Sequence, residues 1–261
     1  MDEVSAHTMG IRTKSLKMAT NHGQARKTEF ARLLYGDIRA LVKEVLADSI
    51  DYEPHASPGK RFVQLREAQW ALQWFVSNEP PEGHSALLLT GTVPALACKP
   101  WAKMGIAFDF IGYESDPYKY WRAFSCLPGA RRQVGNQLTP LWVHKGQDVR
   151  AKITVINGDI LDDRQDKVYS VIDADFCRSY IRDPADREHL LELIARQGPP
   201  TGPFVFRTTV HVGHTDNSRG DIRRHTREFK EGLERSGFDI LASNRSSYHC
   251  MMSLIYILER L

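Results

Sequence analysis

The sequence has few cysteines, no long hydrophobic run and little net charge. Its four cysteines are scattered without a C-x-x-C pair, which excludes a zinc or disulfide framework and favours a reducing compartment. Its apolar runs are too short to span a membrane, and the first residues lack the apolar segment of a secretion signal. A net charge of +3 does not by itself indicate nucleic-acid binding. We therefore expect a cytoplasmic protein with no membrane partner.

The 261 residues, 42% of them hydrophobic, are enough for one large domain with an addition. Residues 1–22 read as a flexible basic lead-in, 23–84 as a helical extension and 85–261 as an α/β domain. Apolar residues at three- and four-residue steps predict helices over 24–49 and 61–77. The first helix either packs on its own domain or forms a homodimer.

Seven short apolar runs alternate with helical patterns after residue 85, which predicts a mostly parallel, Rossmann-like sheet covered on both faces. Only nine residues separate the last two runs, too few for a crossover helix, so the C-terminal strand should pair antiparallel. The strands are expected at 86–89, 107–113, 152–157, 168–172, 204–209, 238–243 and 253–259, and the helices at 95–104, 118–127, 185–196 and 222–236.

A glycine turn or an acid follows each of the first four predicted strands. The carboxyl ends of parallel strands share one edge of a sheet, where open α/β folds bind their ligands. Each carboxylate alone is better explained as a loop acid or a helix cap, but their joint placement favours a nucleoside site. The residues are Thr90, Gly91 and Thr92 after the first strand, Glu114 and Ser115 after the second, Gly158, Asp159 and Ile160 after the third, and Asp173, Asp175 and Phe176 after the fourth.

These strand ends and the closing hairpin resemble the class I S-adenosylmethionine-dependent methyltransferases over about residues 85–261. The resemblance implies S-adenosylmethionine as cofactor, with Glu114 on the ribose hydroxyls and Asp159 on the adenine amino group. It implies that the turn at Gly91 approaches the methionine part of the cofactor. The neighbouring residues Thr90, Thr92, Ser115, Gly158 and Ile160 would complete the cofactor site, and Asp173, Asp175 and Phe176 would border the methyl donor and the acceptor as catalytic residues.

The first loop departs from the family pattern, because it carries a single glycine and places Val93 and Pro94 where the backbone usually approaches the cofactor. The sequence therefore leaves a second hypothesis open, a methyltransferase-shaped binding or assembly module without catalysis. No metal site is predicted, since His211, His214 and Asp216 lack a further ligand pair.

Arginines at the start of the last helix favour a nucleic-acid acceptor, and a solvated helix face is the alternative. The basic residues are Arg219, Arg223, Arg224 and Arg227, with Arg131, Arg132, Lys145 and Arg150 elsewhere in the chain. The segment from Asp173 to Phe176 loosely resembles the Asp-Pro-Pro-Tyr loop of amino-group methyltransferases, although both prolines are missing.

Overall fold

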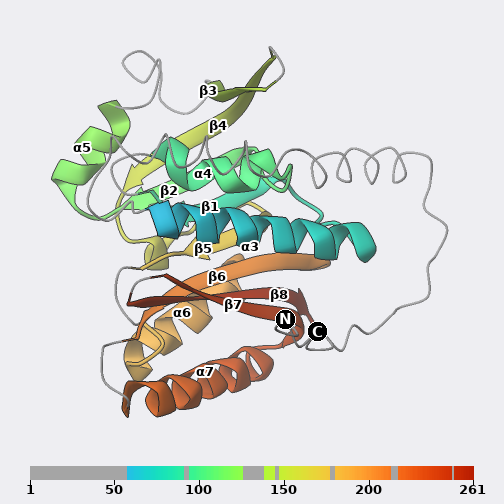
Figure 1. Ribbon diagram of the computed structural model, residues 1–261, viewed down its shortest axis with the longest axis vertical. Helices are drawn as coiled ribbons and strands as arrows, with labels where there is room; N and C mark the ends of the chain where they lie inside the picture. Colours follow the sequence, from blue (N-terminus) through green and yellow to red (C-terminus); the bar gives the residue numbers. More distant parts are fainter. Residues whose placement is uncertain are drawn as a thin grey trace, which may run out of the picture.

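In the computed structural model, one eight-stranded sheet lies between two layers of helices (Figure 1). The structure describes residues 58–90, 94–125, 138–144, 147–176, 180–212, 217–248 and 250–261. The strands are β1 Ser85–Leu89, β2 Asp109–Glu114, β3 Leu138–His144, β4 Gln147–Asn157, β5 Tyr169–Ala174, β6 Pro203–His211, β7 Phe238–Tyr248 and β8 Met251–Arg260. The helices are α3 Pro58–Ser77, α4 Pro94–Lys103, α5 Pro117–Ser125, α6 Pro184–Gln197 and α7 Asn217–Arg235, with a short 3-10 turn, η1, at Ile160–Asp162.

The strand order is β3-β4-β2-β1-β5-β6-β8-β7. Strand β1 pairs parallel with both β2 and β5, and the parallel pairing continues outward to β4 and β6. Strand β8 runs antiparallel between β6 and β7, as the short connection in the sequence predicted. The chain order reverses between β1 and β5, which makes that point the switch of a doubly wound sheet.

Both faces of the sheet are buried, which explains why its central strands read as continuous apolar runs rather than alternating ones. On one face Leu87 and Ile111 pack with α6 and α7, and on the other Leu88 and Phe110 pack with α3 and α4. Asp183 begins α6 by accepting hydrogen bonds from two backbone amides of its first turn, and a proline follows it. The described helices include none that is long and apolar enough to cross a membrane.

Helix α3 belongs to the core of the sheet, since Leu65, Leu72 and Phe75 lie in the same apolar cluster as the β1 residue Leu88. It crosses the sheet beside α4 and over β7 and β8 (Figure 1). The division of the chain at residue 84 stays a prediction, but α3 itself packs on one face of the sheet.

All seven predicted strands are present, so the Rossmann-like fold with an antiparallel C-terminal strand is confirmed. The prediction missed an eighth strand, β3, which pairs antiparallel with an amino-terminal extension of β4. The predicted helix over 24–49, and with it the predicted dimer contact, lies outside the described residues, as does the lead-in over 1–22.

A close approach between β2 and the end of β1 yields a stability prediction. A Cβ added at Gly112 would lie 2.0 Å from Cγ2 of Thr90, so Gly112→Ala should lower the free energy of unfolding by about 1–3 kcal/mol. Adding Thr90→Ser should recover part of this loss, because it removes Cγ2. Urea unfolding of the variants measures the effect.

The control is Gly158→Ala, because the nearest heavy atoms to a Cβ there belong to the ring of Tyr113 at 3.8 Å. Equal losses in the two alanine variants, or no recovery with Thr90→Ser, would contradict the proposed clash.

Candidate functional site

The register of the parallel strands brings the predicted strand ends to one edge of the sheet. Leu89 lies opposite Tyr113, and Glu114 lies opposite Asn157. Leu88 lies opposite Asp173 on the other side of β1. We call this edge the carboxyl rim, meaning the described residues at the ends of β1, β2, β4 and β5, namely Thr90, Glu114, Ser115, Gly158, Asp159, Asp173, Asp175 and Phe176.

Glu114 is half-buried at the end of β2 and is tied to its surroundings by its backbone. Its carbonyl oxygen accepts hydrogen bonds from the amide of Gly158 at 3.2 Å and from Asn157 Nδ2 at 2.9 Å. Its Oε1 accepts from the backbone amide of Asp116 at 3.0 Å. A carboxylate has about four acceptor sites, so this arrangement orients the group and leaves capacity for ribose hydroxyls.

Asp159 stands at the end of β4 as the N-cap of η1, where its Oδ1 accepts a hydrogen bond from Leu161 N at 3.0 Å. Ile160 is fully buried in the core and anchors this turn to the sheet. Gly158 carries no side chain next to the Tyr113 ring. The two predicted adenosine anchors, on β2 and β4, are therefore neighbours.

Thr90 continues the rim at the end of β1. Its side chain is buried, and Oγ1 donates to the carbonyl oxygen of Tyr113 at 3.4 Å. Gly91 and Thr92 lie outside the described residues, so their predicted contact with the methionine part of a cofactor stays a prediction. The described part of the rim offers carboxylate oxygens of Glu114 and Asp159 to a ligand that carries hydroxyl or amino groups.

The end of β5 is occupied by a buried group of charges that sequence reasoning did not predict. The guanidinium of Arg207, on β6, is fully buried. Its Nε lies 2.7 Å from Oε2 of Glu67 on α3, and its Nη1 lies 2.7 Å from Oδ1 of Asp173 and 3.0 Å from Oδ2 of Asp175. Lys60 Nζ lies 3.1 Å from the same oxygen of Asp175. We call these five residues the Arg207 cluster.

Neutral donors complete the coordination of the carboxylates. Trp101 of α4 donates from Nε1 to Asp173 Oδ2 at 3.0 Å, and Ser253 of β8 donates to Glu67 Oε2 at 3.0 Å. Glu67 Oε1 and Arg207 Nη2 are buried without a hydrogen-bond partner. Both oxygens of Asp173 are therefore engaged by protein groups, and this side chain holds the structure together at the end of β5.

The cluster sets three carboxylates against two cations, so its electrostatics differ from those of a surface ion pair. Burial raises the pKa of Glu67 above its usual value, although Arg207 acts in the opposite direction. Burial alone would also raise the pKa of Asp175, but Lys60 and Arg207 hold it well below its usual range. Of the carboxylates of Glu67 and Asp175, that of Glu67 therefore takes up a proton more readily.

Asp173, Asp175 and Phe176, predicted as catalytic, are all buried in this structure. The ring of Phe176 packs on that of Tyr180, with 3.7 Å between the ring centroids. These three residues belong to the carboxyl rim, and their contact with an acceptor stays a prediction. A charged residue in the buried apolar strand β6 was the sequence signal that pointed to the missed cluster, because a buried guanidinium requires counterions.

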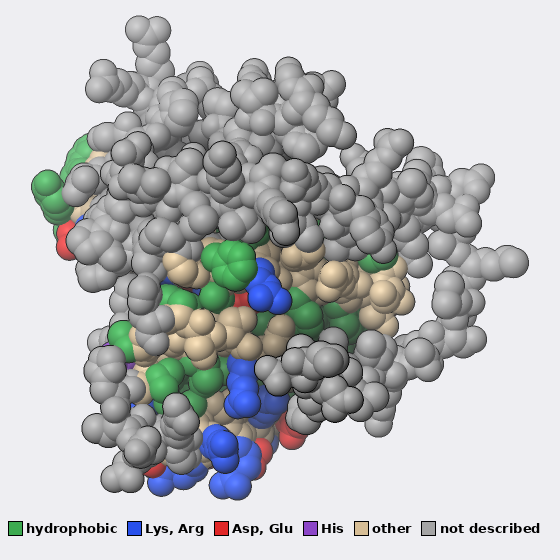
Figure 2. All heavy atoms as spheres, viewed as in Figure 1, with side chains coloured by type: hydrophobic (Ala, Val, Ile, Leu, Met, Phe, Trp, Pro, Cys, Tyr) green, Lys and Arg blue, Asp and Glu red, His purple; other side chains and the backbone are tan. Residues whose placement is uncertain are grey.

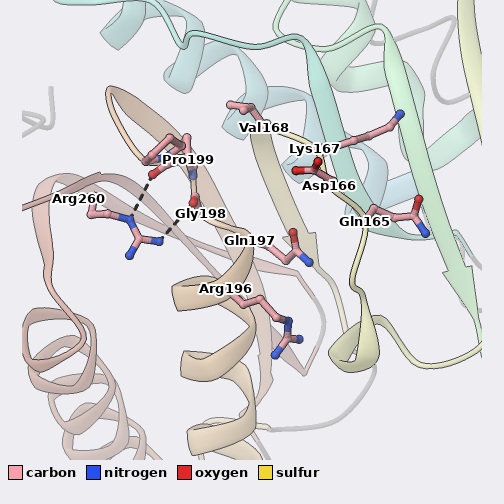
Figure 3. Close-up of a pocket in the computed structure, with 10 residues that line it drawn as sticks. Gln165, Asp166, Lys167, Val168, Arg196, Gln197, Gly198, Pro199 and Arg260 are labelled. Carbon is pink, nitrogen blue, oxygen red and sulfur yellow. Dashed lines mark hydrogen bonds between the residues drawn. The ribbon is translucent and has the colours of Figure 1, made fainter.

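A cavity of about 510 Å³ opens at the opposite edge of the sheet (Figure 3). Its wall includes Val168, which directly precedes β5, and the loop after α6. The cations at this cavity have protein partners, since Lys167 Nζ lies 2.6 Å from Asp109 Oδ2 and Arg260 Nη2 donates to Gly198 O at 3.3 Å. Because it lies at the opposite edge of the sheet, the cavity is separate from the predicted strand-end site.

The predicted basic surface of α7 is balanced by acids of the same helix. Arg224 lies 3.5 Å from Asp221 and 3.8 Å from Glu228, and Arg227 lies 3.7 Å from Glu231. Both basic (blue) and acidic (red) side chains appear where α7 lies in Figure 2. This helix face is solvated and its arginines are paired with acids, so it offers little net charge to a phosphate backbone. Outside the described residues, or without a described side chain, are Arg131, Arg132, Lys145, Arg150 and Arg219.

The raised pKa of Glu67 gives a pH prediction. A carboxyl whose folded-state pKa exceeds its usual value of 4.5 binds more protons in the folded state, so the free energy of unfolding falls as the pH rises through that window. Glu67→Gln cannot titrate, so its unfolding free energy should lack this fall as the pH rises above 4.5. Urea unfolding at several pH values measures the slope.

The matched control is Glu234→Gln, an exposed position of α7, which should keep the wild-type slope. A Glu67→Gln slope equal to that of the wild type would show that Glu67 is ionised in the folded protein.

No family model and no curated protein matches the chain. Among solved structures it is similar to the N-methyltransferase NodS from Bradyrhizobium japonicum WM9, at 14% identity and a TM-score of 0.47, over 78% of this chain and 97% of that one. It is similar to magnesium protoporphyrin IX methyltransferase from Synechocystis PCC 6803 with bound SAH, at 12% identity and a TM-score of 0.48, over 91% and 95%. Methanococcus jannaschii fibrillarin is similar at 14% identity and a TM-score of 0.44, over 69% of each chain.

The order of the parallel strands, their reversal between β1 and β5, and the antiparallel β8 agree with the resemblance found in the sequence. By this topology, the chain has the Rossmann-like fold of the class I S-adenosylmethionine-dependent methyltransferases.

Proposed function

We propose that the protein is an S-adenosylmethionine-dependent methyltransferase that binds its cofactor along the carboxyl rim. The observation that carries the proposal is the placement of Glu114 and Asp159 on paired strands beside the switch point, each with one oxygen fixed by a backbone amide. Glu114 and Ser115 hold the ribose, Gly158 and Asp159 border the adenine, and the buried Ile160 anchors the turn behind them.

The remaining rim residues serve the methyl donor and the acceptor in this proposal. The cofactor, when bound, supplies an activated methyl group on a sulfonium. The segment from Thr90 to Thr92 approaches its methionine part. Asp173, fixed by Arg207 and Trp101, borders the donor, and Asp175 and Phe176 border the acceptor. Methyl transfer needs chiefly in-line positioning, so a rim with few groups free for acid–base work is compatible with it.

The burial of the Asp173 and Asp175 carboxylates favours the second candidate function, a methyltransferase-shaped binding or assembly module without catalysis. In that case both acids serve only to hold α3 and β6 on β5. A chain of this kind would keep the fold and bind no methyl donor. Under either candidate function we propose a cytoplasmic location, because the cysteines are scattered as in proteins of reducing compartments.

Calorimetry with S-adenosylmethionine and S-adenosylhomocysteine tests the proposed function. Wild-type protein should bind both, and Glu114→Gln should bind about 10- to 100-fold more weakly, because hydrogen bonds to a charged group contribute about 1.5–3 kcal/mol. Glu234→Gln is the control and should bind as the wild type does. Absence of binding to the folded wild type would favour the module without catalysis.

For the acceptor we propose a single-stranded nucleic acid, supported by the exposed rings of α5. Tyr118 and Trp121 are 70% and 63% exposed and lie three residues apart on the helix that begins just after Glu114. Lys119 lies between them in the sequence. Exposed aromatic rings beside a cation are the usual means of stacking unpaired bases.

Titrating the protein with a mixed-sequence RNA oligonucleotide, followed by tryptophan fluorescence, tests this acceptor class. Trp121→Ala should weaken binding about 5- to 100-fold, from about 1–3 kcal/mol per stacked base. Phe108→Ala, which removes an exposed ring just before β2 at the opposite edge of the sheet, is the control and should leave the affinity unchanged. An affinity that survives Trp121→Ala would remove α5 from the acceptor site.

A further inference from the structure

Two side chains of the first turns of α3 converge on one carboxylate oxygen at the rim. Lys60 Nζ lies 3.1 Å from Oδ2 of Asp175, and Gln64 Nε2 donates to the same oxygen at 3.1 Å. The spacing of four residues places both on one face of the helix. The side chains of Lys60 and Asp175 are only 14% and 6% exposed, so water screens this ion pair much less than it would a surface pair.

Asp175 is the residue at which the chain leaves β5, and β6 holds it from the other side. Thr209 Oγ1 donates to Asp175 Oδ1 at 3.0 Å and also to the carbonyl oxygen of Phe176. The amide of Phe176 donates to Ala174 O at 2.9 Å. The exit of β5 is therefore fixed between β6 and α3, by side chain and backbone together.

We propose that Lys60 and Gln64 are positioning residues, which hold Asp175 and the backbone of Phe176 in the arrangement that borders the acceptor side of the site. The assignment of these residues to the acceptor side rests on the proposed function, whereas their contacts with Asp175 do not. The structure thus makes the start of α3 part of the candidate site, although it is distant in sequence from every strand end.

The docking of α3 does not depend on this contact. Farther along the helix, Glu67 pairs with Arg207, and Leu72 and Phe75 lie in the core. Replacing Lys60 should therefore leave the helix in place and act locally at Asp175. Asp175 would keep Arg207 and Gln64 as partners but lose one of its two cations.

Amide hydrogen exchange, followed by NMR in the full chain, tests the proposal at one residue. In Lys60→Met the Phe176 amide should exchange about tenfold faster or more, because a hydrogen bond to a charged group is lost. The amides of Leu72 and Phe75 should keep their wild-type rates. Lys60→Arg retains the charge and should restore slow exchange at Phe176.

The matched control is Arg66→Met, which removes a cation from the same helix at an exposed position beside the ring of Phe62. In Arg66→Met the Phe176 amide should exchange at the wild-type rate. An unchanged rate at Phe176 in Lys60→Met would overturn the proposal. Faster exchange spread over the core amides of α3 would also overturn it, because Lys60 would then act on the fold as a whole.

Calorimetry with S-adenosylhomocysteine separates this proposal from the proposed function. A wild-type protein that binds none removes the cofactor proposal, while the exchange rates still decide whether Lys60 positions Phe176. Where the wild type binds, Lys60→Met should bind within about threefold of it, since the adenosine anchors lie on β2 and β4. A larger loss would overturn the assignment of Lys60 to the acceptor side.

Discussion

The parallel pairing of β4, β2, β1 and β5 is the constraint on which the candidate site depends. Parallel strands point their carboxyl ends the same way, so residues far apart in the sequence meet at one edge. The register places Glu114 beside Asn157, and the hydrogen bonds from Gly158 and Asn157 to the carbonyl of Glu114 fix the two ends together. Close approach at Gly112 lets Thr90 lie across the neighbouring strand.

Burial of both faces of the same sheet has a second consequence, which is the Arg207 cluster. A guanidinium inside the strand layer has no water, and it is stable there only with carboxylates in contact. Glu67 comes from α3, Asp173 from β5 and Asp175 from the residue after β5, so the ion pairs join the helix to the sheet at the rim. Any arrangement that separated one partner from the cluster would leave the others charged and buried without a counterion. The cluster therefore favours this one arrangement of α3 and the strands.

The sequence predicted the elements whose signal is local and missed those that depend on distant contacts. Seven strands were recognised because their apolar runs are continuous, whereas β3 was missed because Pro140 interrupts its pattern, as is usual only at a sheet edge. Glu114 and Asp159 were identified because they stand at or close to the carboxyl ends of strands. The partners Glu67 and Arg207 are 140 residues apart, and only the packing of α3 across the sheet brings them together.

The central claim is that the rim, and no other edge of the sheet, binds a nucleoside. NMR of isotope-labelled protein titrated with S-adenosylhomocysteine tests it most directly. We expect the amide signals of Glu114, Gly158 and Asp159 to shift until the site is saturated, while those of Lys167 and Gly198, which line the cavity at the opposite edge, stay unchanged. Shifts confined to that cavity, or none in the folded protein, would contradict it.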